Sequence, residues 1–128
     1  MDFENISVGC DIEQISRFKD KIDNRIFLQK IFTDYEINYC LSRAKPEEHF
    51  AVRFCAKEAV IKSLTEFDIT GIFYKDIEIV NEKSGMPKVK ILKLKKNIQI
   101  KISLSHSGVF ASAMVVACRQ GYMATSVS

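Results

Sequence analysis

Residues 53–62, Arg-Phe-Cys-Ala-Lys-Glu-Ala-Val-Ile-Lys, place four charged groups in a pattern typical of a helix. At about 100° per residue, one stripe of this helix is apolar and comprises Phe50, Phe54, Ile61 and Leu64. Lys57 projects into that stripe. Because a buried ammonium is costly unless it is paired or reaches a polar group, the pattern predicts a functional site as well as a scaffold.

Glu58 and Lys62 stand one helical turn apart, and two interpretations fit them. They can form an ordinary surface ion pair, worth a few tenths of a kcal/mol (~0.3). Alternatively, their carboxylate and ammonium can serve a ligand. The residues alone leave both interpretations open.

Two further segments end in polar groups. Residues 7–13, Ser-Val-Gly-Cys-Asp-Ile-Glu, have the pattern of a short apolar strand that runs into Asp11. Residues 102–107, Ile-Ser-Leu-Ser-His-Ser, form a second strand pattern, and its hydroxyls and imidazole are expected to converge at the strand terminus. Asp11 can cap a helix that begins at Ile12, which Asp does well. It can also join Glu58 in a hard-oxygen site suited to Mg²⁺.

Length and composition indicate an ordinary globular protein. The chain has 128 residues, 47% of them hydrophobic and 27% charged, which predicts one domain over residues 1–119 with a loose tail at 120–128. No apolar run approaches the roughly 20 residues that cross a bilayer. The acidic N-terminus lacks the layout of a signal peptide. We therefore expect a cytoplasmic protein with no membrane partner.

The cysteines and lysines exclude some classes of site. The four cysteines show no Cys-x-x-Cys pair and no His at zinc spacing, which favours buried free thiols; they are Cys10, Cys40, Cys55 and Cys118. A lysine-rich run comprises Lys88, Lys90, Lys93, Lys95, Lys96 and Lys101. Such a run is either a solvated strand face or a surface for an acidic partner or a phosphate.

The periodicity of the chain predicts an α+β domain. The N-terminal half should hold a strand and then helices, in the ranges 5–11, 12–18, 26–32, 33–43 and 46–65. Thr33 and Glu36 have capping-box spacing, and Pro46 suits the first turn of the long central helix. After Gly71 the period becomes that of antiparallel strands, at 76–80, 89–94, 98–104 and 110–118, with the last strand apolar enough to be central.

Taken together, the three segments V-G-C-D-I-E, R-F-C-A-K-E-A and S-L-S-H-S resemble the signature of holo-acyl-carrier-protein synthases. These are small stand-alone 4′-phosphopantetheinyl transferases, and the resemblance covers residues 5–118. It implies that family's fold and the Mg²⁺-dependent transfer of 4′-phosphopantetheine from coenzyme A to a serine of apo-acyl-carrier protein. It also implies a role in fatty acid biosynthesis and a homotrimer with coenzyme A bound at the subunit interfaces.

The resemblance assigns roles to the charged residues. Asp11 and Glu58 match metal ligands, while Lys57 and Lys62 match positions along the nucleotide and its phosphates. Arg17 matches a position that contacts the acidic carrier protein, and Arg25 is expected to assist it.

Four more residues match the coenzyme A site. Gly85 and Pro87 correspond to a turn near the phosphates, although an ordinary hairpin turn explains them equally well. Ser105 and His106 match a segment that contacts the nucleotide. The general base is not identified by the sequence.

Two other function classes are weaker. An RNA-binding surface on the lysine-rich half usually has aromatic residues among the basic ones, and residues 88–101 have none. We therefore expect no nucleic-acid partner. An inactive oligomer subunit would not explain the joint presence of Asp11, Glu58 and Lys62.

Overall fold

The computed structural model describes residues 3–94 and 97–119. The predicted tail at 120–128 lies outside these residues, as do Lys95 and Lys96. The elements follow in the order η1 (Phe3–Asn5), β1 (Ile6–Gln14), α1 (Ser16–Lys19), α2 (Arg25–Ile31), α3 (Asp34–Leu41), α4 (Pro46–Thr65), η2 (Tyr74–Asp76), β2 (Ile77–Asn81), β3 (Pro87–Ile91), β4 (Ile98–Ser107) and β5 (Phe110–Arg119). This order confirms the predicted α+β class.

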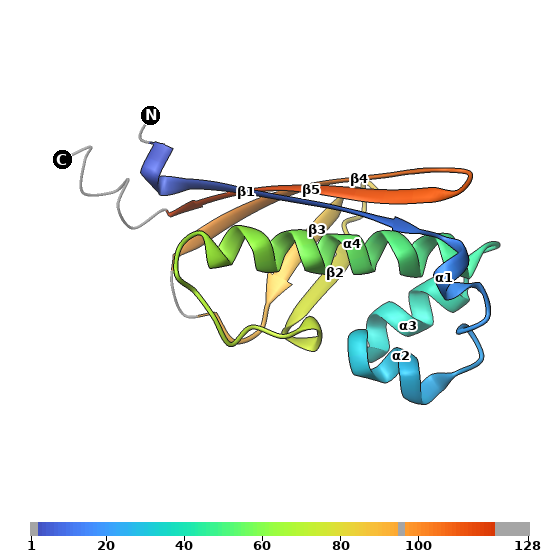
Figure 1. Ribbon diagram of the computed structural model, residues 1–128. Coiled ribbons are helices and arrows are strands. Elements are labelled where there is room, and N and C mark those ends of the chain that lie inside the picture. Colours follow the sequence, from blue (N-terminus) through green and yellow to red (C-terminus); the bar gives the residue numbers. More distant parts are fainter. Residues whose placement is uncertain (1–2, 95–96, 120–128) are drawn as a thin grey trace.

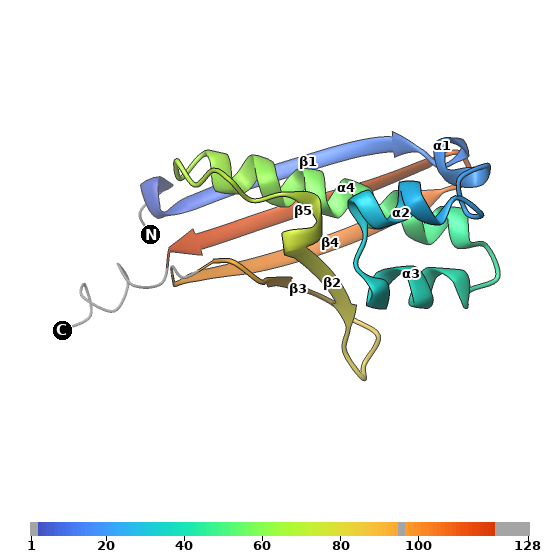
Figure 2. The same cartoon turned by 90° about the horizontal axis from the view of Figure 1, so that it is seen from below.

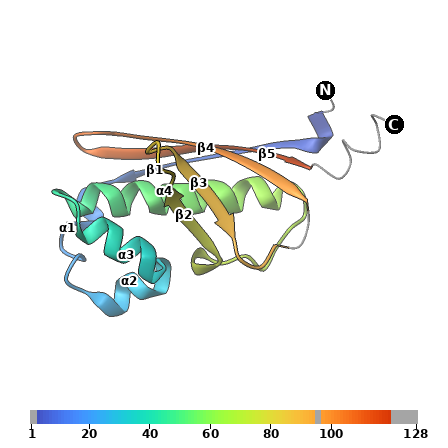
Figure 3. The same ribbon diagram turned by 180° about the vertical axis from the view of Figure 1, so that it is seen from behind.

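The long helix α4 lies along one face of an antiparallel sheet (Figure 1). The sheet has the order β1-β5-β4, so the apolar strand β5 is central, as predicted. Helices α1–α3 gather at one end of α4 (Figure 2). The β2–β3 hairpin forms a separate two-stranded sheet, seen from behind in Figure 3. No other element of the described chain covers the outer face of the three-stranded sheet.

Helix α4 is buried on nearly all sides, and not only along the predicted apolar stripe. From residue 50 to residue 60, every residue is buried except Glu58. The cause is that β1 and β5 pack on one side of α4 while α1, α3 and β2 contact its other sides. A helix enclosed in this way buries residues that a two-sided amphipathic pattern would leave in water.

Strand β1 is longer than predicted, and the helix predicted over residues 12–18 begins later than expected, since α1 comprises Ser16–Lys19. Residues 12–14 continue in β1, where Asp11 is paired with Ala113 and Ile12 with Ser112. Hydrogen bonding to β5 overrides the short helical pattern, since each added residue of the strand gains a ladder partner. Asp11 therefore caps no helix.

The start of α3 confirms the predicted capping box. The Glu36 backbone N–H donates to the Thr33 hydroxyl over 3.3 Å, and the Thr33 N–H donates to Glu36 Oε1 over 2.9 Å. These bonds satisfy orphan donors of the first turn. Pro46 opens α4 as predicted, at a position whose missing N–H costs no helix bond.

Lys57 and Glu36 form an ion pair in which both side chains are fully buried. Lys57 Nζ lies 2.7 Å from Glu36 Oε1, and it also donates to the backbone oxygens of Tyr74, over 2.8 Å, and Ile77. Glu36 Oε2 accepts from the Ile79 N–H over 2.8 Å. Burial lowers the pKa of Lys57, and the Glu36 carboxylate opposes that shift. The pair therefore ties α3 and α4 to the segment from η2 into β2.

The cysteines are free thiols, as predicted, but only part of the expected burial is observed. Cys40 and Cys55 are buried, and burial raises the pKa of each to about 12. Cys10 is exposed, because it lies on the uncovered outer face of the sheet. Of the helices in the ranges described above, none is both long and apolar enough to cross a bilayer.

Replacing Lys57 with Met should destabilise the protein by about 3 kcal/mol, because Glu36 would keep a buried charge without its counter-ion. Urea denaturation measures this loss. Lys62→Met is the matched control, since that exposed lysine should contribute about 0.5 kcal/mol or less. The double variant Lys57→Met/Glu36→Gln should recover part of the lost stability. A Lys57→Met protein as stable as the wild type would contradict the assignment.

Candidate active site

The position of Asp11 depends on a close approach between β1 and α4. At Gly9 an added Cβ would lie 2.0 Å from the Ala59 backbone oxygen, so only glycine allows this contact. Asp11 follows on the same face of β1, because side chains alternate along a strand. The contact therefore sets Asp11 beside the part of α4 that carries Glu58 and Lys62.

Lys62 pairs with Asp11 and not with Glu58. Lys62 Nζ lies 3.3 Å from Asp11 Oδ1 and donates to the Cys10 backbone oxygen over 2.9 Å. The Asp11 side chain is 19% exposed and that of Lys62 is 53% exposed, so both remain accessible to a ligand. The interpretation of Glu58 and Lys62 as a surface ion pair is thus wrong, because Lys62 pairs with a carboxylate of β1 instead.

Glu58 is the one residue between positions 50 and 60 of α4 that is not buried. Its Oε1 accepts a hydrogen bond from the Tyr74 hydroxyl. This bond is the main reason why the pKa of Tyr74 rises to about 12, and the charge of Asp11 adds to the shift. Asp11 therefore lies within electrostatic range of the same hydroxyl. Nothing local in residues 72–76 marks this contact, so Tyr74 is a candidate site residue that the sequence alone does not indicate.

Arg17 lies at the rim of the carboxylate cluster, which comprises Asp11 and Glu58. Its Nη1 is 2.6 Å from Glu13 Oε2, and its guanidinium is 5.1 Å from the centroid of the Phe54 ring. Half of the side chain is exposed. Arg25 instead lies 3.7 Å from Asp34 on the neighbouring helix. Of the two predicted partner-binding arginines, Arg17 is the one beside the cluster.

The donor set of the cluster fits Mg²⁺. Within residues 3–94 and 97–119, no group of three or more His, Cys, Asp or Glu side chains is arranged to hold a metal. Asp11 and Glu58 supply two carboxylates, and Mg²⁺ usually takes only one or two together with waters and substrate phosphates. A structural zinc or calcium site needs four or more protein ligands. The cluster therefore suits a cation that a phosphate substrate completes.

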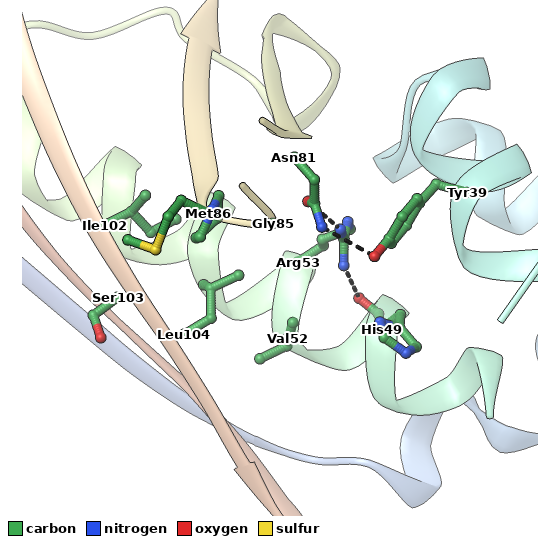
Figure 4. A pocket seen from close by; sticks show the side chains of 11 residues that line it. Tyr39, His49, Val52, Arg53, Asn81, Gly85, Met86, Ile102, Ser103 and Leu104 are labelled. Atoms are coloured by element: carbon green, nitrogen blue, oxygen red, sulfur yellow. Dashed lines mark hydrogen bonds between the residues drawn. The ribbon is translucent and has the colours of Figure 1, made fainter. Parts of the chain in front are cut away.

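A second polar site is a pocket of about 330 Å³ on another side of α4 (Figure 4). The Arg53 guanidinium stacks 4.5 Å from the Tyr39 ring centroid and donates to Asn81 Oδ1 over 3.0 Å and to the His49 backbone oxygen over 3.4 Å. The Arg53 Nε is buried and has no hydrogen-bond partner in the described chain. A buried cation beside an open pocket is a candidate binding position for an anion.

Gly85, in the turn between β2 and β3, and Pro87, the first residue of β3, both line this pocket. Gly85 has a φ of +89°, a conformation that favours glycine. The geometry of the hairpin turn is therefore a sufficient reason for glycine at this position. No described atom lies near enough to contact an added Cβ there, so a close approach within the chain is not the reason for glycine. Its two interpretations, turn and ligand contact, both remain compatible with the structure.

The predicted convergence of Ser105 and His106 is wrong, because the two lie on one strand and point to opposite faces of the sheet. Ser105 lines a groove on the outer face whose lining also includes Asp11 and Lys62. His106 lies on the other face. Burial and then the charge of Arg53 lower the pKa of His49, and His106 is near enough to add to this shift. His106 therefore lies near His49, which lines the Arg53 pocket, whereas Ser105 lies in the groove with Asp11 and Lys62.

Lys57 requires the same kind of correction. The resemblance places Lys57 along the nucleotide phosphates, but its ammonium is buried in the core, where it is paired with Glu36. The physical reason is the carboxylate on α3, which the spacing of charges along α4 could not reveal. Lys62 is the lysine of this helix that a phosphate can reach.

Comparison with known proteins decides the family. A profile of the 4′-phosphopantetheinyl transferase superfamily matches residues 7–120. The chain belongs to this superfamily. A holo-[acyl-carrier-protein] synthase from Chloroherpeton thalassium is 40% identical over 117 residues, covering 87% of this chain and 96% of that protein. One from Thermodesulfovibrio yellowstonii is 44% identical over 112 residues, covering 85% and 95%.

Solved structures of the superfamily share the fold. The crystal structure of a holo-(acyl-carrier-protein) synthase from Bacillus anthracis str. Ames, in complex with CoA (3′,5′-ADP), superposes with a TM-score of 0.73. The two chains are 31% identical, and the match covers 88% of this chain and 95% of that one. This agreement confirms the fold implied by the three sequence segments.

Proposed function

We propose that this transferase moves the 4′-phosphopantetheine group of coenzyme A to a serine of an apo-acyl-carrier protein. The serine oxygen forms a bond to the β-phosphorus of the coenzyme A pyrophosphate. The bond from that phosphorus to the bridging oxygen breaks, and adenosine 3′,5′-bisphosphate leaves with the electron pair. The family membership and the named relatives support this reaction. Supplying holo-carrier protein for fatty acid biosynthesis in the cytoplasm is part of the proposal.

The observation that carries the proposal is the pairing of Lys62 with Asp11, with Glu58 one helical turn before Lys62 on α4. Phosphoryl transfer needs positioning and charge neutralisation more than covalent chemistry. Asp11 and Glu58 would hold Mg²⁺, which when bound neutralises charge on the pyrophosphate oxygens. The exposed Lys62 ammonium, already 3.3 Å from Asp11, would bind a phosphate oxygen as a mobile point charge.

The nucleotide of coenzyme A would occupy the Arg53 pocket. Its lining by Gly85 and Pro87, the nearby His106 and the unpartnered Arg53 Nε all support an anionic ligand there. The lysines of β3, Lys88 and Lys90, are exposed on the adjoining hairpin and add positive potential.

One copy of the chain does not hold both halves of this site together. Arg53 and Lys62 are nine residues apart on α4, a rotation of about 180° at 100° per residue, so they point to opposite sides. We therefore infer that two copies complete each site. The outer face of the sheet supports such an assembly, since it exposes large apolar side chains; these are Val8, Ile12, Phe110, Met114 and Val116. The homotrimer implied by the resemblance is our proposal for its symmetry.

Asp11→Ala and Glu58→Ala should each abolish transfer while the fold survives, because both side chains are partly exposed. The measurement is transfer from coenzyme A to apo-acyl-carrier protein at saturating Mg²⁺, with circular dichroism as the test of folding. Cys10→Ala, next to Asp11 but on the outer face of β1, is the matched control. Wild-type turnover in either carboxylate variant would rule out the metal assignment.

Arg17→Glu should reduce the use of carrier protein at least about tenfold, because reversing a rim charge slows association with an acidic partner. Its affinity for coenzyme A should stay unchanged. Arg25→Glu is the control on the neighbouring helix, and we expect a smaller effect. Steady-state kinetics with each substrate varied in turn measures both. An equal loss for both substrates would place Arg17 in the nucleotide site instead.

Mixing two inactive variants tests whether copies share a site. Asp11→Ala removes one half, and Met86→Glu puts a negative charge in the Arg53 pocket, where it should repel phosphate. Co-expressed at equal amounts, the two should restore about a quarter of wild-type turnover, since random assembly leaves that share of interfaces intact. No recovery in a mixed assembly verified by mass spectrometry would show that each site lies within one chain.

A further inference from the structure

Tyr74 connects the carboxylate cluster to the rest of the fold in a way that neither the family motifs nor the proposed mechanism uses. Its hydroxyl donates to Glu58 Oε1, and its ring packs 5.4 Å from the Phe54 ring, centroid to centroid. Phe54 and Glu58 are one helical turn apart on α4. The ring and the hydroxyl of Tyr74 therefore follow the same face of this helix.

The backbone of Tyr74 is held as firmly as its side chain. Lys57 Nζ donates to the Tyr74 backbone oxygen over 2.8 Å, and the buried Glu36 carboxylate fixes that ammonium from the other side. Lys57 and Glu58 are adjacent on α4 and point about 100° apart. One of them thus anchors the backbone of Tyr74 inside the core, while the other receives its hydroxyl at the site.

We propose that Tyr74 is a positioning residue for Glu58. Its hydroxyl donates to Oε1, so Oε2 is the carboxylate oxygen that remains for a metal ion. This inference rests on the proposed function, because it takes Glu58 as a metal ligand. The Lys57–Glu36 pair acts on the site through Tyr74 and never touches the substrate.

The expected size of the effect follows from partners of metal ligands in general. Hydrogen bonds that orient a ligating side chain change metal affinity by about 10–100-fold when they are removed. The hydrogen bond also withdraws charge from the Glu58 carboxylate, which lowers its affinity for a metal and so opposes the benefit of a fixed orientation. Because Glu58 lies on the solvent-facing edge of α4, where its side chain is otherwise free to rotate, orientation should dominate. We therefore expect an effect near the lower end of that range.

Tyr74→Phe tests the inference, since it removes the hydroxyl and keeps the ring on Phe54. Mn²⁺ binding to the enzyme with coenzyme A, followed by electron paramagnetic resonance, should weaken about tenfold. The Mg²⁺ concentration for half-activation should rise in parallel, while KM for coenzyme A at saturating Mg²⁺ stays within about twofold. Tyr35→Phe is the matched control, a tyrosine with an exposed ring on α3. Its Mn²⁺ affinity should equal that of the wild type.

Glu58→Ala and the double variant Glu58→Ala/Tyr74→Phe separate the possible failures. If Glu58→Ala binds Mn²⁺ as the wild type does, Glu58 is no ligand and the metal assignment itself falls. If Glu58→Ala loses binding but Tyr74→Phe binds as tightly as the wild type or tighter, only the role of Tyr74 is overturned. The inference is supported when Tyr74→Phe weakens binding in the presence of Glu58 and adds no further loss in its absence.

Discussion

The close contact of β1 with α4 at Gly9 is the constraint on which the site depends. A strand can pack this near a helix only where it has no side chain, and here the Ala59 backbone oxygen occupies the space of a Cβ. From that point, strand alternation carries Asp11 to the face on which Glu58 and Lys62 lie. A wider separation of β1 and α4 would leave Lys62 without Asp11 and would separate the two carboxylates.

The burial of α4 determines which of its polar groups can reach a ligand. Because strands and helices enclose the segment from residue 50 to residue 60, any polar side chain there must be paired or reach solvent. Lys57 is paired with Glu36, and Arg53 is partly satisfied by Asn81 and the His49 backbone. Glu58 alone reaches solvent in this stretch. Helix α4 thus carries a buried ion pair, Lys57–Glu36, and two differently charged surfaces. The acidic one lies at Glu58 and the basic one at Arg53.

These two surfaces are the basis of the proposal that two copies complete each site. They lie on different sides of the same helix, whereas coenzyme A carries its pyrophosphate and its nucleotide phosphate on one molecule. The uncovered face of the sheet is apolar enough to bury against another copy.

The sequence by itself determined the α+β class, most element positions, the capping box at Thr33 and the family, because these follow from local periodicity and short motifs. It also predicted Asp11, Glu58 and Lys62 as site residues. Only the tertiary structure decided how the charges pair. Lys57 meets Glu36 across 21 positions of sequence, Lys62 meets Asp11 across 51, and Tyr74 meets Glu58 across 16. The extension of β1 past Asp11 likewise depended on β5, about a hundred residues away. Contacts of this kind depend on how distant elements pack, and no local pattern encodes them.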